Sequence, residues 1–124
     1  MSGKTPSKAP KEVPEKTPEE TPYCMVMTTI AGEALAEALA WEIVHARLGA
    51  CVQVQNIKSF YRWKNEARSE HECLLLIKTR KALYRPLEDF IRAHHSYETP
   101  EIVQLPITAG SADYLQWVAS ETGG

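Results

Sequence analysis

The chain has 124 residues, and its 14 Lys and Arg residues nearly balance its 16 Asp and Glu residues, for a formal net charge of −2. This length suits a single domain. The near-neutral charge and the dispersed basic residues argue against a protein that holds nucleic acid or an anionic membrane through bulk charge. No apolar run approaches the roughly 20 residues that a membrane-spanning helix needs.

The N-terminus and the cysteines both indicate the cytoplasm. The first 22 residues contain neither the apolar stretch of a secretory signal nor the arginines of a mitochondrial presequence. Cys24, Cys51 and Cys73 are widely spaced and form no C-x-x-C pair, which fits reduced thiols. We therefore expect a cytoplasmic protein with no membrane and no nucleic-acid partner.

Residues 1–22 differ in composition from the rest of the chain. Proline recurs at every fourth position from Pro6 to Pro22, which forbids a helix. The few apolar residues of this segment cannot offset the entropy of ordering it. The sequence predicts a disordered Pro/Lys/Glu-rich tail over residues 1–22 and a folded domain over residues 23–124.

The first half of the domain shows a strand, a helix and a long second strand. Residues 23–29 are β-prone, and the helical pattern that follows carries one broad apolar stripe and stops at Gly49. The next β-prone run, residues 50–63, far exceeds the typical five or six residues of a strand, so part of it must project or bend. Its apolar alternation changes parity near Gln55 and Asn56, which predicts a β-bulge there.

The second half continues the alternation of strands and helices. Residues 64–70 are expected to turn the chain, and residues 71–80 to return as a strand. Residues 81–95 have a helical pattern whose first turn should be irregular, because Pro86 is not tolerated in a helix interior. A fourth strand is predicted over residues 102–107 and a last helix over residues 111–122, with Ser111 as its cap.

The order β-α-β-β-α-β with an added C-terminal helix predicts an α+β, ferredoxin-like fold. The runs at residues 24–27 and 73–77 are apolar at both alternating positions, and such strands are covered on both faces. In so short a chain, the last helix or another copy must cover the second face. The projecting hairpin favours a homo-oligomer with packed sheets over a monomer capped by its own last helix.

Five motifs resemble those of the CutA divalent-cation-tolerance family. In chain order they are GACVQ (49–53), SFYRW (59–63), ECLLLIKT (72–79), HSYETPEI (95–102) and YLQW (114–117). The resemblance runs from about Tyr23 to Glu121. It implies a ferredoxin-like subunit in a homotrimer with PII-like architecture, and an association with tolerance to copper and other divalent cations.

The sequence departs from the family pattern at two loops. The family usually has Gly shortly after the hairpin Trp, where this chain has Lys64 and Asn65, and Asn65 can replace Gly because it tolerates a left-handed conformation. The family also has Pro in the later motif where this chain has Ser96. The second change removes a conformational lock from the loop.

Four side chains are the candidate metal ligands. His71 and Cys73 lie two residues apart on one strand face, so they can share an ion, whereas the adjacent His94 and His95 point in different directions. Cys73 sits among leucines and suits a small buried hydrophobe equally well. The strongest candidate is Cys51, which matches the family's Ala-Cys-Val position. The candidate set is Cys51, Cys73, His71 and His95, for Cu²⁺ or another divalent cation.

A second set of side chains is predicted to form a ligand pocket at a subunit junction. Alternate residues of the long strand point to one face, and a carboxylate, an ammonium and phenols can converge on it. Such a set binds a small polar ligand or forms a satisfied hydrogen-bond network. The predicted pocket residues are Ser59, Tyr61, Trp63, Lys78, Tyr97 and Glu98.

No catalytic triad order, P-loop, dinucleotide-binding motif or zinc-protease motif is present in the sequence, so we expect a protein that is not an enzyme and needs no organic cofactor. The leading interpretation is a trimeric cytoplasmic protein that sequesters or senses divalent metal ions. The alternative is a PII-like signalling module that binds a small anionic metabolite between subunits. A third interpretation is a structural trimer without a ligand.

Overall fold

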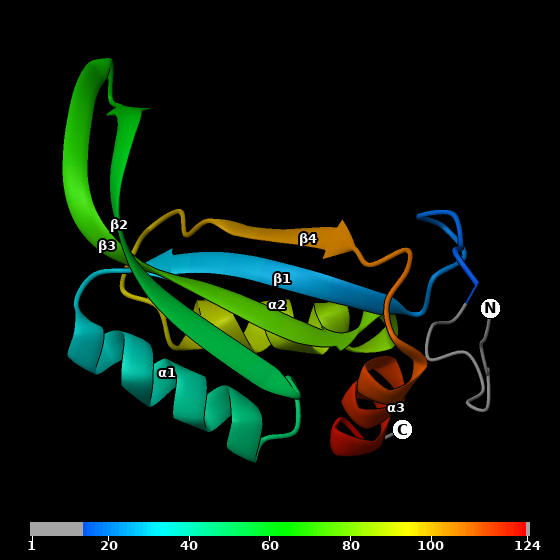
Figure 1. The fold of residues 1–124 in the computed structure, drawn as a ribbon. Coiled ribbons are helices and arrows are strands. Elements are labelled where there is room, and N and C mark those ends of the chain that lie inside the picture. The colour runs from blue at the N-terminus through cyan, green and yellow to red at the C-terminus, as the bar shows by residue number, and fades with distance from the viewer. Residues whose placement is uncertain (1–13, 124) are drawn as a thin grey trace, which may run out of the picture.

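The computed structural model describes residues 14–123 and has the predicted order of strands and helices (Figure 1). No helix within these residues is long and apolar enough to cross a membrane. The elements are β1 (Tyr23–Ile30), α1 (Glu33–His45), β2 (Cys51–Trp63), β3 (Glu66–Arg80), a 3₁₀ turn η1 (Lys81–Leu83), α2 (Tyr84–Ala93), β4 (Ile102–Pro106) and α3 (Ala112–Glu121).

The four strands form one antiparallel sheet in the order β2-β3-β1-β4. The two central strands, β1 and β3, pair without interruption from Tyr23 opposite Arg80 to Ile30 opposite Cys73. Helices α1 and α2 lie together against one face of this sheet (Figure 1). This arrangement confirms the α+β, ferredoxin-like fold.

The hydrophobic core lies between the sheet and these two helices. Alternate residues of β1 and β3 point into it, and Val26, Leu75 and Ile77 are fully buried. Ile43 of α1 and Leu87 of α2 close the core from the other side, also without exposure. Strict alternation on the central strands therefore fixes which face carries the helices.

The opposite face of the sheet, which we call the open face, is also apolar. Val103 and Leu105 on β4 are 44% and 39% exposed. Helix α3 covers only the end of this face near Arg80, whose guanidinium donates to the carbonyl of Thr122 at 2.6 Å. The apolar residues of the open face are Met25, Met27, Leu74, Leu76, Val103 and Leu105.

Strands β2 and β3 form a hairpin that projects beyond the helices (Figure 1). The predicted β-bulge is wrong, because the ladder runs in one register from Cys51 opposite Lys78 to Trp63 opposite Glu66. The apolar residues of β2 change from one face of the strand to the other because the surroundings of the two faces differ along its length. Val52 packs against the core, whereas Ile57 lies further along the strand on the other face.

The hairpin turn is tighter than the sequence predicts. It consists of Lys64 and Asn65, both with positive φ (52° and 68°), so β3 begins at Glu66 and not at residue 71. Two residues with positive φ are typical of the type I′ turn that matches strand twist. The prediction that Asn65 takes a left-handed conformation is confirmed.

The regular part of α2 begins at Tyr84, after η1, which confirms the irregular first turn. Pro86 therefore stands within the first turn of α2, where no intrahelical donor is lost. Ser111 is the N-cap residue of α3, as predicted, and has extended conformation, but its side chain makes no capping hydrogen bond.

Of the predicted tail, residues 1–13 lie outside the described residues, and residues 16–22 contact the domain. The Lys16 amide donates to the carbonyl of Thr108 at 2.8 Å. The Thr21 hydroxyl is buried and donates to the carbonyl of Ile107 at 2.6 Å. Hydrogen bonds between the N-terminal segment and the rest of the domain therefore begin before Tyr23, the first residue of β1.

Candidate functional site

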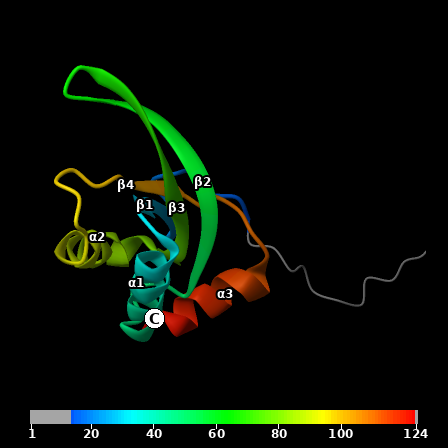
Figure 2. The same cartoon turned by 90° about the vertical axis from the view of Figure 1, so that its left-hand side faces the viewer.

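A groove of about 560 Å³ lies under the projecting hairpin. The end of the hairpin arches over toward the side on which the α2–β4 connection lies (Figure 2). One wall is the concave side of the hairpin and the other is that connection. Ser59, Tyr61 and Trp63 alternate along β2 and line the groove together with Tyr97 and Glu98.

A short chain of hydrogen bonds fixes the floor of the groove. The Tyr97 hydroxyl donates to Glu72 Oε2 at 3.0 Å, and the Tyr97 amide donates to His95 Nδ1 at 3.1 Å. Because Nδ1 accepts this bond, the imidazole proton is on Nε2, which donates to the carbonyl of Thr29 at 2.6 Å. His95 therefore ties the α2–β4 connection to β1 through Nε2, while Nδ1 accepts a hydrogen bond within the connection itself.

The charges around the groove are mostly negative. Glu70, Glu72, Glu98 and Glu101 line it, against a single cation, Arg68. The Arg68 guanidinium pairs at 3.1 Å with Glu66, which is not among the lining residues. The groove thus combines aromatic walls with carboxylates that its one lining cation does not neutralise.

The negative charge and burial shift the ionisation of the groove phenols. Desolvation first, and then the hydrogen bond to Glu72, raise the pKa of Tyr97 to about 12. Desolvation and a hydrogen bond to Glu70 also raise the pKa of Tyr61. Both phenols therefore stay protonated at neutral pH, and that of Tyr97 donates to the Glu72 carboxylate.

The Tyr97 phenol should be detectable in an alkaline titration. Because its pKa is raised in the folded state, its stabilising contribution is complete below pH 10 and is lost as the pH rises toward 12. In the Tyr97→Phe variant, we expect the free energy of unfolding to fall less steeply between these pH values than in the parent chain. Denaturant unfolding at several pH values, with absorbance of tyrosinate, measures this. Identical pH profiles for both proteins would contradict the assignment.

Five of the six predicted pocket residues meet in the groove, but Lys78 does not. Lys78 pairs with Cys51 at the far end of β2 from Trp63, where its ammonium donates to Gln53 Oε1 at 2.7 Å. The sequence prediction missed Glu70, Glu72 and Glu101. Glu72 pairs with Ile57 and therefore points to the same side of the hairpin as Ser59, into the groove. The sequence alone does not give this pairing, because it depends on the register of the hairpin.

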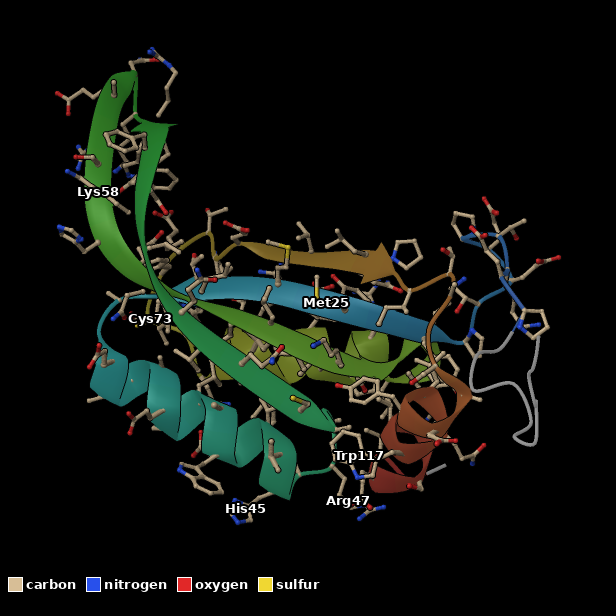
Figure 3. All side chains as sticks on the ribbon, viewed as in Figure 1. Met25, His45, Arg47, Lys58, Cys73 and Trp117 are labelled. Carbon is tan, nitrogen blue, oxygen red and sulfur yellow. The ribbon has the colours of Figure 1, made fainter. Side chains whose placement is uncertain are left out.

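The candidate metal ligands do not meet in one place. Cys73 is buried at the foot of the hairpin (Figure 3), where its thiol donates to Asn56 Oδ1 at 3.3 Å. Burial and the carboxylates of Glu33 and Glu37 raise the pKa of the Cys73 thiol. His71 lies two residues earlier on β3 and is exposed. Among residues 14–123, no group of three or more His, Cys, Asp or Glu side chains is placed to hold a metal ion.

Cys51 differs from the other two thiols. Cys24 and Cys73 are buried, and burial raises the pKa of Cys24 to about 11, whereas Cys51 is partly exposed. Cys51 begins β2 on the open-face side, opposite Lys78, and its thiol is close enough to Tyr114 of α3 to contribute, after desolvation, to the raised pKa of that phenol. It is the thiol of this chain that solvent or a neighbouring molecule can reach.

The model of the family described as CutA1 divalent ion tolerance protein matches residues 24–121. The chain belongs to this family. Divalent-cation tolerance protein CutA of Thermus thermophilus is 40% identical over 100 residues, which cover 80% of this chain and 97% of that protein. Chloroplastic protein CutA of Arabidopsis thaliana is 41% identical over 79% of this chain but only 54% of its own length, so the chain spans about half of this relative.

Solved CutA structures share the fold. CutA from Synechococcus elongatus superimposes with a TM-score of 0.82 at 30% identity, and covers 90% of this chain and 95% of its own. The Thermus thermophilus structure, titled a divalent cation tolerance protein, gives a TM-score of 0.79 at 38% identity over 82% of this chain and 99% of its own. The likeness thus extends over sheet, helices and hairpin.

Proposed function

We propose that this chain is a divalent-cation tolerance protein that binds a borderline divalent ion, Cu²⁺ above all, through the thiolate of Cys51. The observation that carries the proposal is that Cys51 is the accessible thiol, while the other two are buried. Thiolate sulfur selects soft or borderline ions. Sequestration at such a site lowers the free ion concentration without any chemical turnover.

We further propose that three copies of the chain assemble through their open faces, with PII-like architecture. Val103 and Leu105 are exposed next to Met25 and Met27, and a contiguous apolar sheet face of this kind is stabilised by burial. Cys51 stands on the same side of β2. Burial of the open face therefore brings each thiol close to a neighbouring copy, which can supply the further ligands that one chain does not gather.

For the groove we propose a binding role. Its lining residues combine aromatic rings, hydroxyl groups and carboxylates, which suits recognition of a small polar ligand. An anionic metabolite, as in the PII-like alternative, is disfavoured by the four carboxylates of the groove. We propose the cytoplasm as the compartment of this chain, whereas Arabidopsis CutA is named chloroplastic and the Archaeoglobus fulgidus structure is titled periplasmic.

Titration with Cu²⁺ tests the assignment of Cys51. We expect the Cys51→Ser variant to bind Cu²⁺ about tenfold more weakly or worse, since losing a thiolate ligand removes more than the ~1.4 kcal/mol that corresponds to a factor of ten. The matched control is Cys73→Ala, which removes a buried thiol and should leave the affinity unchanged. Calorimetry on reduced protein gives affinity and stoichiometry. Equal affinity and stoichiometry in the parent chain and Cys51→Ser would remove the proposed site.

A further inference from the structure

The groove under the hairpin carries negative charge that no cation of the described chain balances. Glu72 is 91% buried, yet its recorded hydrogen-bond partner is the neutral phenol of Tyr97. Within residues 14–123, Glu98 and Glu101 have neither a hydrogen bond nor an ion pair. Among these carboxylates Glu72 is the one held away from water, which is costly unless a positive group approaches it, whereas Glu70, Glu98 and Glu101 are exposed. The four negative charges on two walls make the groove complementary to a cation.

The walls of the groove favour an organic cation over a hydrated one. Phe60, Tyr61, Trp63 and Tyr97 line it, and an ammonium group over an aromatic face is attracted by the negative face of the ring. The same rings can also pack against the methylene groups of a ligand. Carboxylates and aromatic rings together match a ligand with both ammonium groups and methylene segments.

A metal ion does not fit this arrangement. The part of the chain that the structure describes holds no group of three His, Cys, Asp or Glu side chains close enough to share one ion. The carboxylates come instead from separate elements, with Glu70 and Glu72 on β3 and Glu98 and Glu101 on the α2–β4 connection. Such a distribution suits several positive charges spaced along one flexible molecule.

We propose that the groove binds an aliphatic diamine or polyamine, with its ammonium groups on the carboxylates of the two walls and its methylene segments against Tyr61, Trp63 and Tyr97. The volume of about 560 Å³ lies within the range of small-molecule sites. This site is separate from Cys51, which is at the opposite end of β2 from Trp63.

The ionisation of the phenols supports the sign of the charge. The carboxylates of Glu70 and Glu72 contribute to the raised pKa values of Tyr61 and Tyr97. The phenols of Tyr61 and Tyr97, on opposite walls, are therefore both affected by the same two carboxylates.

Equilibrium dialysis and calorimetry of the full chain with spermidine test the proposal at physiological ionic strength. We expect saturable binding, weakened about tenfold or more in the Glu98→Gln/Glu101→Gln variant, because the variant loses two charge pairs with the ligand. The matched control is Glu37→Gln/Glu121→Gln, which removes the same charge from exposed helix positions outside the groove and should bind as the parent does. Trp63→Leu should weaken binding several-fold.

Three results would overturn the proposal: no saturable binding of spermidine, equal weakening in the two double variants, or loss of spermidine binding in Cys51→Ser. Monosodium glutamate serves as the anionic probe and should not bind. Because Cys51→Ser is expected to lose Cu²⁺ and keep spermidine, failure of this site and failure of the metal site give different results.

Discussion

The Val103→Asp/Leu105→Asp variant should exist as a single chain in solution. Both side chains are exposed in the single chain, at 44% and 39%, so a charge at these positions should lower the stability of the isolated subunit only slightly. In an assembly, each carboxylate would be buried against the apolar open face of another copy, which costs several kcal/mol per unpaired ion. Light scattering coupled to size-exclusion chromatography gives the mass.

The matched control places the same charge on another exposed apolar residue. Leu35 on α1 is 53% exposed and lies in the helix layer, away from the open face. Leu35→Asp should keep the assembled mass. An assembled Val103→Asp/Leu105→Asp protein, or dissociation of Leu35→Asp to the same extent, would show that the open face is not the interface.

Leu75→Ala should have the largest effect of a single substitution on folding. Leu75 is fully buried at the centre of β3, opposite Thr28 on one side and Val54 on the other. Removing its side chain loses the burial of three carbons and leaves a cavity, so we expect the free energy of unfolding to fall by about 2–5 kcal/mol.

Denaturant unfolding at one fixed chain concentration measures this loss, since assembly makes stability depend on concentration. Leu35→Ala provides the comparison, because the same atoms are removed from a side chain that is half exposed. Its effect should be within about 1 kcal/mol. Equal losses for the two variants would contradict the placement of the core between sheet and helices.

The sequence was sufficient for the order of the elements and for several local conformations. Uninterrupted apolar residues in β1 and β3 predicted strands with two apolar faces, and on the face toward the helices Val26, Leu75 and Ile77 are fully buried. Pro86 predicted the irregular start of α2, and Asn65 the left-handed turn residue. In each case the backbone preference of one residue decides the structure.

The sequence was insufficient where the outcome depends on tertiary geometry. Near Gln55 the apolar residues of the strand change from one face to the other. Either a bulge or a change in the surroundings of each face produces this pattern, and only the pairing of β2 with β3 distinguishes the two causes. Lys78 was placed in the pocket because it lies on the strand that pairs with the one carrying Ser59, Tyr61 and Trp63. The register puts it instead beside Cys51. The bond from Tyr97 to Glu72 joins residues 25 positions apart, which spacing along the chain does not reveal.

Strand β2 connects the open face, the accessible thiol of Cys51 and the groove. This strand begins at Cys51 beside α3, crosses the edge of the open face and ends at Trp63 above the α2–β4 connection (Figures 1 and 2). Its first half follows the helix layer and its second half projects beyond it. Its two ends therefore lie in different surroundings. The sulfur of Cys51 is at one end, and at the other the rings of Tyr61 and Trp63 lie beside carboxylates of β3 and the α2–β4 connection.

The mass of the full-length chain in dilute solution tests the burial of the open face most directly. Three chains of 13.9 kDa give an expected mass of about 42 kDa, which should persist on dilution because obligate interfaces are large and apolar. Light scattering over a dilution series provides this measurement. A well-folded particle of 13.9 kDa at every concentration would contradict the shared interface, and with it the placement of Cys51 next to a neighbouring copy.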